Sequence, residues 1–225
     1  MISAFSLTMA WHAWLKWPAL TLKDRKIFKT ILLSRKFDDR LDIFEYGTGY
    51  STYYFARFLK GKKIPFHFHS IDNNRPWHEK IKTLILNSRI DNEVTLHLCS
   101  FIPFWEKQGW DWKNPGVCGQ FSPQRKEEFD YINRPLSLNQ KFDMIVIDGR
   151  FRKRCLEVAR ACLKPRGIIF FHDAQKPRYT IPDGFIKYAA LINDGHFFPF
   201  ERTSYRCWVG SPDDDIVLDL AKEFQ

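Results

Sequence analysis

Carboxylates and glycines lie at the ends of two short apolar segments in the first third of the sequence. Glu45 precedes Gly47 and Gly49, and Asp72 lies 23 residues beyond Gly49. Glycine leaves room for a ligand to lie against the backbone, and a carboxylate at a neighbouring strand end can accept hydrogen bonds from both hydroxyl groups of a ribose. These residues therefore indicate a ligand that contains a ribose. The alternative for Asp72 is a solvated loop acid or a helix cap.

The glycine turn lacks the residues of two phosphate-binding loops. It has no Gly-Lys-Ser/Thr of a nucleotide-triphosphate loop, and Thr52 stands where a nicotinamide-binding turn has its third glycine. Glu45 would repel a pyrophosphate, whereas a carboxylate suits a ligand with an ammonium and a sulfonium group. Ser51 or Thr52 can cap the helix that follows.

Two later apolar segments end in groups that can transfer protons or bind cations. Asp148 follows residues 144–147, and His172 and Asp173 follow residues 167–171. Imidazole titrates near neutral pH, as a general base should, and carboxylate oxygens suit hard cations. The structural alternative is that these side chains form hydrogen bonds or cap helices at strand ends.

Four cations stand within residues 150–154, near the start of a predicted helix, where the helix dipole disfavours positive charge. Residues 141–178 contain ten Lys and Arg against four Asp and Glu, a net charge of +6. Arginine can hold a carboxylate, sulfate or phosphate with two hydrogen bonds. Arg150 and Arg152 are therefore candidates for binding an anionic group, with a solvated basic surface as the alternative.

Short apolar segments alternate with amphipathic segments, which predicts a mainly parallel sheet with helices on both faces. The carboxyl ends of its strands share one edge, where ligands bind in such folds. The predicted strands are residues 42–46, 66–71, 94–99, 144–147 and 167–171, and the predicted helices are residues 22–37, 51–59, 76–86, 124–133 and 151–163.

The two ends of the chain add further elements. Residues 6–17 predict an aromatic-rich helix, so that residues 1–40 form a helical extension, a candidate cap over the active edge, before one domain at 41–225. Residues 183–193 predict a helix, and residues 196–200 and 205–209 predict an antiparallel hairpin. An irregular stretch rich in Trp, Pro and Gly interrupts the domain at about 101–123, and connections of this length are usually functional or disordered.

The composition is typical of a globular protein with excess positive charge. The 225 residues are 44% hydrophobic and 27% charged, with a formal net charge of +9 that favours anionic partners. No apolar stretch reaches the roughly 20 residues of a membrane-spanning helix, and the first residues lack the pattern of a secretory signal. The five cysteines show no metal-binding spacing. We therefore expect a cytoplasmic protein with free thiols.

Four motifs occur in order along the chain: EYGTGYST at 45–52, SID at 70–72, FDMIVIDG at 142–149 and LKPRGII at 163–169. Together they resemble the ordered motifs of class I S-adenosylmethionine-dependent methyltransferases. The resemblance covers about residues 41–209. It implies an α/β fold with a doubly wound, seven-stranded, mostly parallel sheet and a C-terminal antiparallel hairpin.

The resemblance also implies a cofactor site. Glu45 would face the methionine moiety of S-adenosylmethionine, the backbone of residues 47–49 would pass under the cofactor, and Asp72 would bind its ribose. Ser100 and Phe101 would lie near the adenine. The full set of implied cofactor-binding residues is Glu45, Gly47, Thr48, Gly49, Ser51, Thr52, Asp72, Asn73, Ser100, Phe101 and Asp148.

Related metal-dependent O-methyltransferases bind magnesium through aspartates at the positions of Asp148 and Asp173. Here Arg150 and Arg152 follow Asp148, where that subset often has an acidic residue and a histidine. We therefore expect a reaction without magnesium, and magnesium use is the alternative.

The activity that the resemblance implies is methyl transfer, which we expect to reach an oxygen atom of an anionic small molecule or glycan. His172 is the first-choice general base, and Asp148 or Asp173 would orient it or act instead. Aromatic walls suit sugar rings or planar acceptors. The expected acceptor-binding residues are Arg150, Arg152, Trp105 and Trp110.

Two other functions stay open. The net charge and the aromatic residues also suit a methyltransferase of RNA or another nucleic acid, although the Asn/Asp-Pro-Pro-Tyr/Phe motif of amino-methylating enzymes is missing. A protein that binds the cofactor without catalysis, and recruits a partner through its basic face, is the other alternative.

Overall fold

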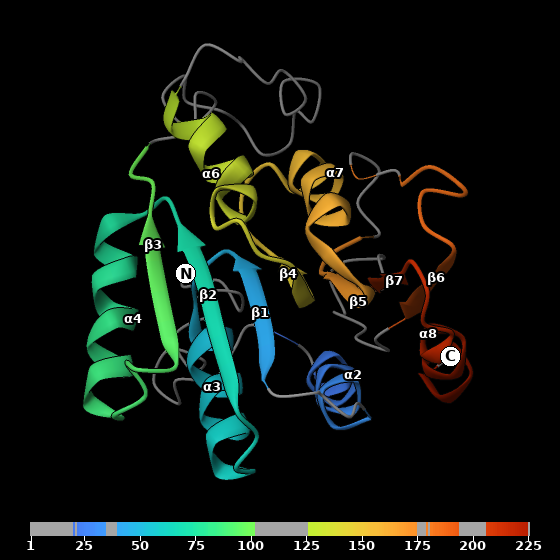
Figure 1. Cartoon of the computed structure of the whole chain (residues 1–225), viewed down its shortest axis with the longest axis horizontal. Helices are drawn as coiled ribbons and strands as arrows, with labels where there is room; N and C mark the ends of the chain where they lie inside the picture. The colour runs from blue at the N-terminus through green and yellow to red at the C-terminus, as the bar shows by residue number, and fades with distance from the viewer. Residues whose placement is uncertain are drawn as a thin grey trace, which may run out of the picture.

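One seven-stranded sheet forms the centre of the molecule (Figure 1). The computed structural model describes residues 20, 22–34, 40–101, 126–174, 179, 181–193 and 206–224. The strand order is β3-β2-β1-β4-β5-β7-β6, with β7 antiparallel to both of its neighbours and the other pairs parallel. The strands are β1 (Leu41–Tyr46), β2 (Phe66–Asp72), β3 (Val94–Leu98), β4 (Phe142–Ile147), β5 (Leu163–Phe171), β6 (Tyr188–Asn193) and β7 (Arg206–Ser211).

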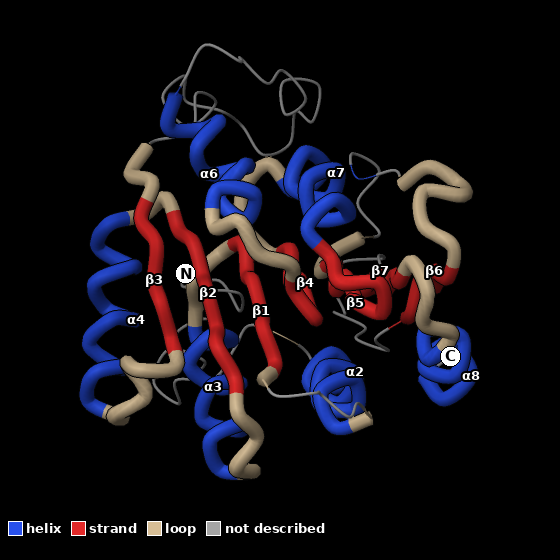
Figure 2. The backbone as a smooth tube through the Cα atoms, in the orientation of Figure 1, coloured by secondary structure: helices blue, strands red, loops and turns tan. Residues whose placement is uncertain are grey.

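Helices cover both faces of the sheet, which confirms the predicted doubly wound fold (Figure 2). One buried cluster joins one face of the sheet to α2, α3, α4 and α8, and a second cluster joins the opposite face to α6 and α7. Ile145 and Val146 of β4 are both fully buried, as expected for a central strand. The helices are α2 (Leu22–Leu33), α3 (Tyr50–Gly61), α4 (Arg75–Asn87), α6 (Lys126–Ser137), α7 (Arg152–Cys162) and α8 (Ile216–Phe224).

The strand order reverses between β1 and β4. The chain leaves β1 toward β2 on one side, and it leaves β4 toward β5 on the other. Tyr46 and Ile147 are paired at the carboxyl ends of β1 and β4. In open α/β sheets such a reversal opens a crevice at the carboxyl edge, where ligands bind.

One prediction near the C-terminus was wrong, and one helix there was not predicted. Residues 188–193 form strand β6 instead of the end of a helix at 183–193, because pairing with β7 and packing against α8 outweigh the local pattern. Helix α8 was not predicted, although Val217, Leu220 and Phe224 are buried at helical spacing. The predicted helix at 6–17, most of the irregular stretch at 101–123 and the predicted strand at 196–200 lie outside the described residues.

The positive charge is concentrated on one layer of helices. Residues 22–34, 50–63 and 75–89, which contain α2, α3 and α4, hold twelve Lys and Arg against two carboxylates, Asp24 and Glu79. Because the whole chain has a net charge of +9, all other residues sum to −1, and the +6 of residues 141–178 is offset by acidic residues elsewhere in the chain. We call α2, α3 and α4 the basic layer. Within the described residues, no helix is long and apolar enough to cross a membrane.

Candidate functional site

The glycine turn after β1 touches the end of β4 backbone to backbone. Gly47 has a φ of +98°, and a Cβ atom added there would lie 2.8 Å from the Cα and N atoms of Gly149. A Cβ atom on Gly149 would in turn overlap the hydroxyl group of Tyr131. Both glycines are therefore needed to bring the two strand ends together.

Gly49 has more room. Its φ of −161° is extended, and the nearest atom to an added Cβ is Ser51 Oγ at 3.6 Å. The turn itself is anchored from outside, because the amides of Gly47 and Thr48 donate to the carbonyl of Ile71 at 2.9 and 3.1 Å. Trp77 of α4 adds a third anchor by donating its indole N–H to the carbonyl of Thr48 at 2.6 Å. The structure thus holds the turn in place while leaving space beside Gly49.

Glu45 lies fully buried beneath the start of α3. Its carboxylate accepts hydrogen bonds from the hydroxyl groups of Ser51 at 2.6 Å, Ser70 at 2.9 Å and Thr52. Burial raises the pKa of Glu45 to about 7 even though these bonds favour the charged form. Ser51 and Thr52 therefore point toward Glu45, and the hydroxyl of Thr48 lies 2.9 Å from that of Ser70.

Asp72 lies at the carboxyl end of β2, on the same edge. It accepts a hydrogen bond from the backbone N–H of Asn74 at 2.7 Å, and Asn74 caps α4 by accepting from Trp77 N–H at 3.0 Å. Burial raises the pKa of Asp72 to about 6. The side-chain amide of Asn73 donates to the carbonyl of Phe101 at 2.9 Å, which ties the end of β2 to the residues after β3.

Three aromatic rings lie together at this edge. The ring centroid of Tyr131 is 5.6 Å from that of Phe101 and 6.3 Å from that of Phe151. The hydroxyl of Tyr131 accepts a hydrogen bond from the backbone N–H of Arg150 at 3.2 Å. Sequence patterns did not identify Tyr131 or Phe151 as site residues, since only the packing of α6 on the sheet brings Tyr131 to this edge. Ser100 is exposed next to Phe101.

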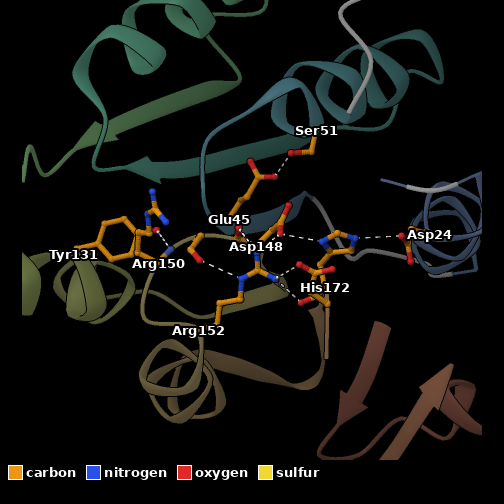
Figure 3. A network of polar contacts seen from close by, with 10 residues as sticks. Asp24, Glu45, Ser51, Tyr131, Asp148, Arg150, Arg152 and His172 are labelled. Carbon is orange, nitrogen blue, oxygen red and sulfur yellow. Dashed lines mark hydrogen bonds and ion pairs between the residues drawn. The ribbon is translucent and has the colours of Figure 1, made fainter. Parts of the chain in front are cut away.

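His172 lies between two carboxylates from distant parts of the chain (Figure 3). Its Nδ1 is 3.0 Å from Asp148 Oδ1, and its Nε2 is 3.4 Å from Asp24 Oδ2 on α2. Burial alone would lower the pKa of His172, but the carboxylates of Asp148, Asp24 and Asp173 outweigh it and raise the pKa well above its ordinary value. Sequence patterns did not identify Asp24 as a partner of this ring.

Arg152 joins the ends of β4 and β5. Its guanidinium donates to the carbonyls of Gly149 at 3.1 Å, His172 at 2.7 Å and Asp148 at 3.1 Å. It also pairs with the carboxylates of Asp148 at 2.8 Å and Asp173 at 3.3 Å. These five contacts match the five N–H donors of an arginine, so Arg152 is committed to its own chain. That Arg152 binds the acceptor stays a prediction, and these contacts argue against it because they already use all five N–H donors.

Arg150 is the exposed member of the predicted arginine pair. Its positive charge lowers the pKa of Asp72 against the larger effect of burial, so the guanidinium acts on the same edge as the candidate ribose site. The predicted acceptor residues Trp105 and Trp110 lie outside the described residues. Across the described residues, no group of three His, Cys, Asp or Glu side chains is arranged to hold a metal ion.

Comparisons with known proteins give one family match. A profile of a methyltransferase domain family matches residues 44–174. This range includes the glycine turn after β1 and the carboxyl ends of β1, β2, β4 and β5. No curated protein matches the chain.

Several solved structures are similar to this chain at low identity. A Klebsiella pneumoniae protein assigned as an O-methyltransferase is 16% identical, with 88% of this chain and 84% of that chain covered and a TM-score of 0.49. A Staphylococcus aureus protein assigned as a caffeoyl-CoA O-methyltransferase is 18% identical, with 75% and 66% covered and a TM-score of 0.46. A Thiobacillus denitrificans methyltransferase solved with S-adenosyl-L-homocysteine is 13% identical, with 67% and 47% covered and a TM-score of 0.39. This chain thus spans about half to two thirds of the length of the last two.

Proposed function

The chain belongs to the methyltransferase domain family, and from this we propose that it transfers a methyl group from S-adenosylmethionine to an oxygen atom of an anionic small molecule or glycan. The observation that carries the proposal is the carboxyl edge beside the reversal of strand order. There the Gly47–Gly49 turn after β1 and Asp72 at the end of β2 lie at adjacent strand ends. This is where α/β sheets bind ligands with a ribose.

The residues at this edge suit each part of the cofactor. The backbone of the glycine turn would run beneath it, Asp72 would accept hydrogen bonds from the ribose hydroxyls, and Phe101 would lie near the adenine. Glu45 would lie on the side of the ammonium group, because a carboxylate attracts a cation. The approach of the ammonium group would in turn lower the raised pKa of Glu45 and favour its charged form. S-adenosylmethionine supplies a methyl group on a positively charged sulfur, and the chain must align the acceptor oxygen with it.

Arg150 would hold the anionic group of the acceptor. It is exposed, it follows β4 at the carboxyl edge, and its charge acts on Asp72. An exposed guanidinium can grip a carboxylate, sulfate or phosphate with two hydrogen bonds. The predicted cap formed by residues 1–40 and the tryptophan-rich stretch would exclude water from the same edge.

Calorimetry with S-adenosylhomocysteine tests the cofactor site. We expect binding to the native protein and an affinity at least about tenfold weaker in Asp72→Asn, because a buried carboxylate that accepts hydrogen bonds is lost. Gly49→Ala should also weaken binding, since its methyl group would enter the space beside the turn. Asp42→Asn is the matched control, because Asp42 pairs with Arg40 and Lys164 at the opposite end of β1. Full affinity in folded Asp72→Asn and Gly49→Ala would reject the site.

Transfer of a labelled methyl group to panels of sulfated, phosphorylated and carboxylated sugars and small molecules tests the acceptor class. Arg150→Gln should raise the KM for the acceptor and have a much smaller effect on the affinity for S-adenosylhomocysteine, because Arg150 acts on the ribose-binding Asp72 only through its charge. If no anionic acceptor is methylated while the cofactor binds, the non-catalytic alternative gains support. If Arg150→Gln leaves the KM for a methylated acceptor unchanged, the proposal that Arg150 binds an anionic group of the acceptor is rejected.

Turnover should not require magnesium. Asp148 and Asp173 are both paired with Arg152, so a divalent cation would have to displace a buried guanidinium to reach them. We expect activity to survive treatment with a chelator, measured once an acceptor is found. Loss of activity that added magnesium restores would contradict this expectation.

The basic layer supports a second candidate, methylation of RNA. Its exposed cations include Lys60 in the last turn of α3 and Lys62 and Lys63 just beyond that helix. Phosphate contacts make binding strongly dependent on salt. A gel shift with RNA that weakens steeply as salt rises, together with methylation of that RNA, would favour this candidate over a small acceptor.

A further inference from the structure

We propose that Asp24 of α2 is a positioning residue for the transfer reaction. Asp24 and Asp148 together hold His172 as an imidazolium, protonated on both ring nitrogens. The imidazolium in turn orients Asp148. The role rests on the proposed function. It makes His172 a fixed hydrogen-bond donor, whereas the sequence predicted a general base.

The geometry around the ring is the basis of this inference. Nδ1 is 3.0 Å from an oxygen of Asp148 and Nε2 is 3.4 Å from an oxygen of Asp24, on opposite sides of the imidazole (Figure 3). A carboxylate only accepts hydrogen bonds, so each nitrogen needs a hydrogen to satisfy its partner. Neutral imidazole carries one such hydrogen and would leave a carboxylate against a lone pair.

Burial makes the neutral form still less favourable. The side chain of His172 is 10% exposed and that of Asp24 is 1% exposed. A buried carboxylate without a positive or hydrogen-bonding partner is costly by several kcal/mol. The imidazolium gives Asp24, which is almost completely shielded from water, a positively charged partner.

Charged groups face this ring from four elements. Asp24 lies on α2, Asp148 follows β4, Asp173 follows β5, and Arg152 lies on α7. Three carboxylates thus surround His172, against the one guanidinium that Arg152 contributes. The raised pKa of His172 is consistent with this arrangement.

A doubly protonated ring cannot take a proton from an acceptor hydroxyl. Within the network, Asp148 has the most exposed side chain, at 26%. When the acceptor oxygen forms its bond to the methyl carbon and the carbon–sulfur bond breaks, with its electron pair left on sulfur, the acceptor hydroxyl donates its hydrogen bond to the Asp148 carboxylate and its proton leaves to water. His172 then keeps Asp148 in the required direction, and Asp24 keeps His172 in place.

Nitrogen NMR of protein with labelled histidine tests the inference without any acceptor. His172→Gln identifies the signals of the ring. In the native protein at pH 7.5, a value chosen about one unit above the ordinary histidine pKa, both ring nitrogens should show the shifts of an imidazolium. Asp24→Asn should bring the midpoint of this titration down by about one pH unit or more, because one of the two carboxylates is replaced by a neutral amide.

Asp214→Asn is the matched control, since Asp214 is also a buried carboxylate and pairs with Arg166 away from the ring. It should leave the His172 titration unchanged. An unprotonated ring nitrogen in the native protein at this pH would overturn the proposal, and so would a His172 titration that Asp24→Asn does not move. The measurement on the native protein does not depend on Asp24→Asn, so it holds even if that variant fails to fold.

Kinetics separate this proposal from the proposed function. We expect Asp24→Asn to lower kcat by about tenfold or more, as loss of a supporting partner commonly does, with the acceptor KM nearly unchanged. Asp24→Glu should restore part of the rate. An imidazolium seen by NMR in a protein without transferase activity would reject the proposed function and retain the charge state of His172. An unchanged kcat in Asp24→Asn would reject the positioning role alone.

Discussion

Glu45 and Asp72 hold their protons more tightly than exposed carboxyl groups, because each is buried at the carboxyl edge. Their pKa values are raised to about 7 and about 6. An ammonium group near Glu45 and ribose hydroxyls on Asp72 would both favour the charged forms. If they bind the cofactor as proposed, the two residues would couple its binding to the release of protons.

Binding of S-adenosylhomocysteine should accordingly release protons between about pH 5 and 7. The affinity should rise with pH across this window, because binding lowers the pKa of both groups. Calorimetry in two buffers with different ionisation enthalpies measures the release directly. Asp72→Asn and Glu45→Gln should each remove a share of it, and identical binding enthalpies in both buffers would contradict the prediction.

The two glycines of the turn should respond differently to alanine. Gly47→Ala should lower the free energy of unfolding by about 2 kcal/mol or more, since a Cβ atom would strike the backbone of Gly149 at a positive φ. Gly49→Ala should cost less than about 1 kcal/mol, because its backbone is extended and uncrowded. Denaturant unfolding measures both values. Equal losses in the two variants would mean that the contact between Gly47 and Gly149 is not what requires glycine.

Individual residues at strand ends could be predicted from the sequence, but their bonding partners could not. Asp148 and His172 follow apolar segments, which gives their location on the sheet edge. That Arg152 turns inward to pair with Asp148, and that Asp24 reaches His172, depends on the folded arrangement of segments far apart in the chain. The assignments of His172 as a base and Arg152 as an acceptor ligand were made without these partners.

At the scale of elements, Arg152 acts as a link between β4, β5 and α7. Arg152→Met should lower the free energy of unfolding by about 3–5 kcal/mol, because two carboxylates lose a buried partner. Arg152→Lys should recover little of this, since an ammonium cannot make the same forked contacts. Arg154→Met on the same helix is the control and should cost under about 1 kcal/mol, because its pair with Glu157 is exposed. A loss in Arg152→Met no larger than in the control would contradict this role.

The central elements were predictable because each carries its own pattern. The apolar run in β4 and the alternation of strands with helices depend on local sequence. Residues 188–193 differ, since Ala189 and Leu191 are compatible with a helix and only the pairing with β7 makes them a strand. Local preference decides little at an edge strand, where tertiary contacts dominate.

At the scale of the whole molecule, three histidines make the fold sensitive to acid. His67 and His69 on β2 lie next to His97 on β3, with His69 Nδ1 3.2 Å from His97 Nε2. Burial lowers the pKa of His69 and His97 to about 4, assisted by neighbouring imidazoles at His69 and by Arg134 and neighbouring imidazoles at His97, and burial lowers the pKa of His67. The unfolded chain therefore binds more protons than the folded chain between about pH 6.5 and 4.

Stability should thus fall as the pH drops through this range. Glu45 and Asp72 act in the opposite direction, because their raised pKa values favour the folded state as pH falls. His69→Phe should flatten the loss, since it removes a group that charges on unfolding and can pack against Phe142. Thermal unfolding at a series of pH values measures the change. An equally steep loss in His69→Phe would assign the acid sensitivity to other groups.

The uneven charge of the molecule also sets the orientation in which it meets a surface. The basic layer lies on one face of the sheet, whereas the glycine turn and Asp72 lie at an edge of that sheet. On a cation-exchange bead the protein should bind through α2, α3 and α4. The carboxyl edge of the sheet, with the proposed cofactor site, should then lie beside the bead surface and remain accessible to the buffer. Immobilised protein should therefore still take up S-adenosylhomocysteine from the buffer, and a rise in salt should detach the protein with its ligand bound.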